Sequence, residues 1–167
     1  MDFDNSKRAI RFLIIILILS GCNETGDTPQ DASADRKADE AAIHAVLTAN
    51  FVASTARNAA GVAETYMADG DAQIAGLPRV STHDAIRSLE EDFGGMPGFQ
   101  SYDGRIENIR FISRDAAIVE ILGTTTLDTG SFDEETTIVV ARALDEWKIA
   151  AWRVMTFDET LLNMLRE

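Results

Sequence analysis

The apolar residues follow the spacing of helices in the first half of the folded region and the alternation of strands in the second half. Spacings of three and four residues predict an amphipathic helix over 35–57 and a shorter helix over 60–67. A short strand at 72–75 follows. Ser81, with an acidic residue three positions later, resembles a capping box, and predicts a third helix that ends at Gly94.

The second half is predicted to be a sheet. Four runs are rich in β-branched and aromatic residues, at 105–112, 116–127, 135–144 and 147–157. The turns between them are short, which favours antiparallel neighbours. Residues 158–166 form a short helix or a frayed end. Helices followed by a long antiparallel sheet indicate an α+β domain over 35–167, with the helices on one face of the sheet.

The N-terminus reads as a signal for export and lipid attachment. Three basic residues precede the apolar run Phe12–Leu19, which as a helix rises about 12 Å, well short of the ~30 Å hydrocarbon core. The pattern is typical of a secretion signal. The run ends in Leu-Ser-Gly-Cys at 19–22, which resembles the bacterial lipobox. The resemblance implies cleavage after residue 21 and acylation of Cys22; a free or buried Cys behind an ordinary cleavable signal is the alternative.

A polar tether is expected to follow. Residues 22–34 are rich in Asp, Thr, Ser, Gly and Pro and carry no periodic apolar positions. The predicted protein is therefore held at the membrane of the cell envelope by lipid on Cys22. Asn23 follows the Cys, where an Asp would resemble an inner-membrane retention signal. In a cell with two membranes, this favours the outer membrane, with the domain facing the periplasm.

Composition excludes several function classes. The 167 residues carry a formal net charge of −13, which works against binding of DNA or RNA. A single Cys excludes a disulfide framework and a four-Cys zinc site. The two His and the acidic residues show no spacing that suggests a metal, and no glycine-rich loop has the context of a nucleotide site. We therefore expect neither a metal nor a cofactor.

The order of elements resembles the nuclear transport factor 2-like (NTF2-like) superfamily, and within it the SnoaL-like polyketide cyclases and ketosteroid isomerase-like domains. The resemblance rests on four loose motifs in a matching order: Ala-Ala-Gly at 59–61, Tyr-Met-Ala-Asp at 66–69, Thr-His-Asp-Ala-Ile at 82–86 and Glu-Trp-Lys-Ile at 146–149. It implies a cystatin-like roll, in which a cone-shaped curved antiparallel sheet wraps around the N-terminal helices. It also implies a small apolar ligand at the open end of the cone and a homodimer.

This sequence does not contain all the residues that the isomerases of this superfamily use for their reaction. That reaction needs a carboxylate base on the first strand and an oxyanion hole made by a Tyr and a protonated Asp. The corresponding stretch of the first strand, 73–76, contains no carboxylate, and the Tyr position falls at Phe51. Two of the three roles are therefore unfilled.

Glu120 is the candidate for a catalytic acid at a position different from those used by the isomerases. It alternates in phase with aliphatic neighbours on its strand, and a carboxylate in an apolar pocket has a raised pKa suited to acid–base work. Alternatively, Glu120 pairs with Arg142 or Arg153 on neighbouring strands, or faces solvent.

Three aromatic residues, Phe51, Tyr66 and Trp152, complete a predicted ligand pocket with Glu120 and Arg142. Strand alternation places Trp152 on the sheet face opposite to the other tryptophan of its strand. Core packing is the alternative role for the tryptophans and for Tyr66.

Three functions remain open from the sequence. The first is a lipid-anchored, non-catalytic module that binds a small ligand or a protein partner. The second is a cyclase- or isomerase-type enzyme that uses Glu120. The third is a structural envelope protein that works as a dimer. The fold does not choose among them, because this scaffold carries many activities.

Overall fold

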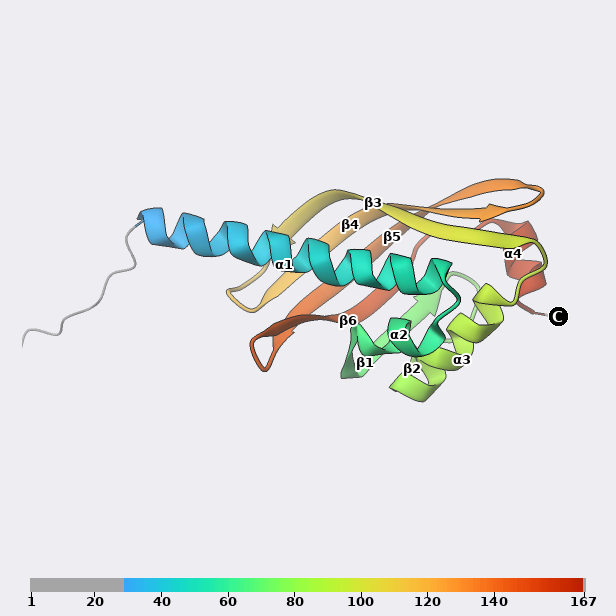
Figure 1. The fold of residues 1–167 in the computed structure, drawn as a ribbon, viewed down its shortest axis with the longest axis horizontal. Coiled ribbons are helices and arrows are strands. Elements are labelled where there is room, and N and C mark those ends of the chain that lie inside the picture. Colours follow the sequence, from blue (N-terminus) through green and yellow to red (C-terminus); the bar gives the residue numbers. More distant parts are fainter. Residues whose placement is uncertain (1–28, 167) are drawn as a thin grey trace, which may run out of the picture.

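The computed structural model describes residues 29–166, in which one long helix lies along a curved sheet of six strands (Figure 1). The predicted signal peptide, Cys22 and the first part of the predicted tether lie outside the described residues. Within the described part of the chain, no helix is long and apolar enough to cross a membrane.

The helices precede most of the sheet, as predicted. Helix α1 (Pro29–Thr55) begins earlier than expected, with a proline at its first position, where the missing N–H has no helical partner to lose. Helix α2 (Ala59–Glu64) is short, and its cap Asn58 accepts from a backbone N–H. Helix α3 (His83–Gly94) is capped by Thr82 rather than by the neighbouring serine.

Six strands and a terminal helix follow these helices or alternate with them: β1 (Tyr66–Ile74), β2 (Val80–Ser81), β3 (Phe99–Phe111), β4 (Ala116–Leu127), β5 (Gly130–Ala143), β6 (Glu146–Val154) and α4 (Glu159–Met164). The spatial order is β2-β1-β6-β5-β4-β3. The four long strands form an antiparallel meander, as their short turns predicted. Strand β1 instead pairs in parallel with β6, so the beginning and the end of the domain lie side by side.

A β-bulge in β6 corrects the predicted orientation of the tryptophans. Ile149 and Ala151 have partners on β5, whereas Ala150 between them has none. One unpaired residue reverses the alternation of all residues beyond it. Trp147 and Trp152 therefore lie on the same, inner face of the sheet, and both are buried.

Phe51 of α1 packs against aromatic side chains of β3 and β6. Its ring packs edge-on against Tyr102 at 5.9 Å and against Trp152 at 6.2 Å between ring centroids. A β-carbon at position 104 of β3 would lie only 2.4 Å from the tip of this ring. Gly104 is therefore the residue that allows α1 to lie against β3.

Candidate functional site

A cleft lies between the helices and the concave face of the sheet, lined from α1, α3, β1, β3, β5 and β6. Its cavity measures about 30 Å³, enough for a water molecule or a group of similar size. Five aromatic side chains line it, which are Tyr66, Phe93, Tyr102, Trp152 and Phe157.

A tyrosine–glutamate pair lies at the centre of the cleft. The Tyr102 hydroxyl donates to Glu134 Oε1 at 2.8 Å, and the Thr136 hydroxyl lies 3.4 Å from the same oxygen. Glu134 is only 4% exposed. On the adjacent strand, a β-carbon at Gly123 would lie 2.6 Å from the Tyr102 hydroxyl and 2.8 Å from Glu134 Cγ. The pair therefore occupies space that only glycine leaves open.

A second carboxyl, Glu90, reaches the cleft from α3. It is partly buried, and the Ser54 hydroxyl of α1 lies 3.4 Å from its Oε2. Burial, together with the nearby charge of Glu134, raises the pKa of Glu90 to about 7, although the bond from Ser54 opposes the rise. The cleft thus holds two acids from opposite walls.

The electrostatics of the Tyr102–Glu134 pair follow from its burial. Loss of hydration raises the pKa of Glu134 to about 7, against the lowering effect of hydrogen bonds from Tyr102 and Thr136. Burial and then the charge of Glu134 raise the pKa of Tyr102 well above its ordinary value. The tyrosine therefore stays a hydrogen-bond donor, while Glu134 exchanges a proton near neutral pH. Side chains of this kind can bind a polar group or transfer a proton.

The structure brings together three of the five residues predicted to form the ligand pocket. Tyr66 and Trp152 line the cleft, and Phe51 packs behind it against Trp152. Tyr66 is buried, so loss of hydration raises the pKa of its hydroxyl well above the ordinary value. The other two predicted residues, Glu120 and Arg142, lie elsewhere.

The placement of Glu120 in the pocket was wrong. Its neighbours Val119 and Ile121 face the core, so the alternation of β4 puts Glu120 on the outer face, where it is exposed. There it accepts a hydrogen bond from the Asn108 side chain at 3.2 Å. The predicted partner Arg153 pairs instead with Asp71 of β1.

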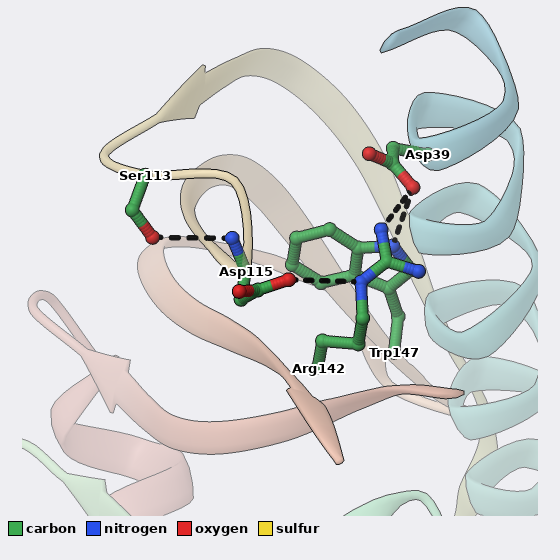
Figure 2. Close-up of polar contacts among 5 residues, drawn as sticks. All are labelled: Asp39, Ser113, Asp115, Arg142 and Trp147. Carbon is green, nitrogen blue, oxygen red and sulfur yellow. Dashed lines mark hydrogen bonds and ion pairs between the residues drawn. The ribbon is translucent and has the colours of Figure 1, made fainter. Parts of the chain in front are cut away.

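The placement of Arg142 in the pocket was also wrong. Arg142 lies on the inner face of β5, but at the other end of the sheet, in what we call the Arg142 cluster (Figure 2). Its guanidinium pairs with Asp39 of α1 and with Asp115 at 3.2 Å, and it stacks 4.9 Å from the Trp147 ring centroid. The Trp147 indole N–H donates to Asp39 at 3.1 Å. The cluster fastens the first half of α1 to the sheet.

The charge of Asp39 is favoured by this arrangement. Burial raises its pKa, but the hydrogen bonds from Trp147 and Arg142 and the positive charge of Arg142 outweigh burial and lower the pKa below the ordinary value. Asp39 therefore stays ionised at neutral pH, which suits a structural ion pair.

Sequence reasoning missed the three ionisable residues that define the cleft, although signals for them existed. Glu134 shares the alternation of Ile138 and Val140, but the predicted strand began one residue after it. Tyr102 likewise preceded the predicted start of β3. Glu90 follows Ile86 by four residues and so lies on the same, core-facing side of its helix. For Tyr102 and Glu134 the strand was predicted but its start was placed too late, whereas Glu90 lies within the predicted helix.

No group of three or more His, Cys, Asp or Glu side chains suited to a metal ion occurs within residues 29–166.

No protein-family model matches the chain, and no curated protein matches it by sequence.

Solved structures do resemble it. A domain with a cystatin-like fold from Nostoc punctiforme superposes with a TM-score of 0.64 at 18% identity, covering 77% of this chain and 84% of that one. A hexachlorocyclohexane dehydrochlorinase (LinA) type 2 gives 0.61 at 20% identity, covering 75% and 91%. A ketosteroid isomerase-like protein from Erwinia carotovora atroseptica gives 0.58 at 19% identity, covering 70% and 96%. The chain therefore has the cystatin-like α+β fold shared by NTF2-like and ketosteroid isomerase-like proteins, as its sequence predicted.

Proposed function

We propose that this protein is a lipid-anchored component of the bacterial cell envelope whose NTF2-like domain binds a small ligand in the cleft. The observation that carries the proposal is the cleft itself, in which aromatic walls enclose a buried Tyr102–Glu134 pair. Apolar walls with a few fixed polar groups are the usual composition of a small-molecule site.

Binding without chemistry is the simpler reading of these residues. The position expected for the isomerase tyrosine holds Phe51, and the stretch 73–76, at the end of β1 and just beyond it, contains no carboxylate. Lipid on Cys22 would hold the domain at the membrane, with the outer membrane favoured in a cell that has two. A dimer formed by two such domains is compatible with this role and is part of the proposal.

Native mass spectrometry tests the ligand. The full chain is produced in the bacterial envelope, extracted in mild detergent and compared with Ser54→Leu, which places a larger apolar side chain in the cleft. The matched control is Val52→Leu on the exposed face of the same helix. We expect a discrete small-molecule adduct on the parent and the control but not on Ser54→Leu. An adduct shared by all three, or absent from all three, contradicts a ligand in the cleft.

An enzyme is the second candidate, favoured by one observation. Glu134 is buried, hydrogen-bonded to Tyr102 and has a pKa of about 7, which suits a general base near neutral pH. The catalytic acid of such an enzyme would thus be Glu134 rather than Glu120. The similar fold of a hexachlorocyclohexane dehydrochlorinase suggests a first assay, chloride release from hexachlorocyclohexane. Release that Glu134→Gln abolishes and Glu120→Gln leaves unchanged would establish an enzyme.

A further inference from the structure

We propose that the ligand of the cleft is an organic cation, an amine or ammonium compound whose positively charged nitrogen lies between Glu134 and Glu90. The proposal rests on the ligand-binding function proposed above and names its chemical class. Three features of the cleft support it: two acids without a positive partner, aromatic walls, and a small cavity. The net negative charge of the whole chain is the fourth argument.

The acids of the cleft have no positive partner there. Glu134 and Glu90 both line it, whereas no Lys, Arg or His does so among the described residues. Both hydrogen bonds to Glu134 reach Oε1, so its Oε2 accepts none from residues 29–166. Two carboxyls without a countercharge are costly to ionise in an apolar site, and a bound cation would remove that cost.

The aromatic walls suit the same ligand. Tyr66, Phe93 and Trp152 line the cleft together with the two acids, and the faces of aromatic rings attract cations, most strongly in Trp. A carboxylate together with several ring faces is the combination that recognises ammonium groups. A neutral apolar ligand would leave the two carboxyls without a positively charged partner.

The size of the cavity fits a charged head rather than a whole ligand. About 30 Å³ holds a group no larger than a small ammonium. Leu89, Glu90 and Phe157 are only partly buried, so the cleft reaches solvent between α3 and the segment after β6. The rest of the ligand would lie along this opening. The net charge of −13 favours the approach of a cation from solution.

Binding of a cation must be coupled to proton release. The ionisable groups facing the site are Glu90 from α3, Glu134 from β5, Tyr66 from β1 and Tyr102 from β3, while α1 and β6 contribute none to the cleft. The tyrosines stay protonated, because burial raises the pKa of each well above 10. The two glutamates therefore account for the pH dependence, and a cation binds best once both have lost their protons.

Isothermal titration calorimetry with a charged and a neutral probe of the same shape tests the proposal. The full chain, purified in detergent, is titrated with 2-phenylethylammonium and with 2-phenylethanol, each against a detergent blank. We expect the ammonium to bind about tenfold more tightly or better. Its affinity should rise about tenfold for each coupled glutamate between pH 6 and pH 8, with proton release at pH 7 that depends on the buffer's ionisation enthalpy.

Variants identify the groups responsible. Glu134→Gln and Glu90→Gln should each remove most of the preference for the ammonium, whereas Glu120→Gln, with the same charge change on the outer face, should retain it. Equal affinity for the two probes refutes the cation and leaves a ligand-binding cleft in place. Binding of neither probe also refutes it, and the mass-spectrometric test then decides separately whether the cleft holds any ligand.

Discussion

The close contact between Gly104 and Phe51 allows the cost of one added methyl group to be worked out from the structure. In Gly104→Ala, the new β-carbon would lie 2.4 Å from Phe51 Cζ and 2.8 Å from Cε1. Carbon atoms in contact prefer 3.5–4.0 Å, so the ring must move by about 1 Å. It cannot move freely, because Tyr102 and Trp152 pack against it.

Two opposing effects set the expected magnitude for Gly104→Ala. Overfilling a packed core costs about 1–3 kcal/mol. Replacing glycine by alanine also restricts the unfolded chain, which stabilises by about 0.4–1 kcal/mol where the backbone allows it. The overfilling is larger, so we expect a net loss of about 1–2 kcal/mol in the free energy of unfolding.

Urea unfolding followed by tryptophan fluorescence measures this loss, since both tryptophans are buried. A double-mutant cycle assigns it: Phe51→Leu removes the ring atoms that clash, so adding Gly104→Ala to that variant should cost close to nothing. Gly94→Ala is the control, because its β-carbon would make an ordinary contact of 3.4 Å with Arg57. The reasoning fails if Gly104→Ala costs less than about 0.5 kcal/mol, or costs as much beside Phe51→Leu as alone.

Three further predictions concern the charged groups and the anchor. The pKa of Glu134 is about 7 in the folded chain against 4.5 for an unburied Glu, so the folded state keeps a proton that the unfolded state loses, and the free energy of unfolding should fall as pH rises from 4.5 to 7. In urea titrations at pH 5 and pH 8, Glu134→Gln should reduce the difference in the free energy of unfolding between the two pH values by up to about 3 kcal/mol. The same difference in the variant and the parent would contradict the assignment. Arg142→Met should destabilise by about 0.5–1 kcal/mol, less in high salt, because it breaks the pair with Asp39; equal loss at all salt concentrations would show that packing on Trp147 dominates. Cys22→Ser should abolish partitioning into the detergent phase after phase separation, and partitioning like that of the parent would refute lipid attachment.

The fold was largely predictable because the spacing of apolar residues along the chain shows directly which face of each element is buried. The helix over 35–57 and the four long strands of the meander all appear in the structure, although α1, β3 and β5 begin five or six residues earlier than predicted. The parallel pairing of β1 with β6 was not predictable, since nothing local in either segment specifies a partner so distant in the chain.

The site was less predictable than the fold, because strand ends and bulges decide which face a side chain takes. Glu120 was chosen for its aliphatic neighbours, but the strand is flanked by apolar residues on both faces and the carboxylate lies outside. Glu134 was missed because its strand was predicted to begin one residue after it. Trp147 was placed on the face opposite to Trp152 because the unpaired Ala150 leaves no mark in the sequence. A single inserted residue is enough to turn a side chain to the other face, because strand side chains alternate with a period of two.

The parallel pairing of β1 with β6 determines when the cleft can form during folding. Strands β3 to β6 form a chain of hairpins and can assemble from local contacts, which fold fast. Strand β1, with β2 beside it, has no place in the sheet until β6 at the far end of the domain is present. On a chain that emerges from its N-terminus, the wall carrying Tyr66 therefore joins last, and a chain cut short before β6 would have a meander but no cleft.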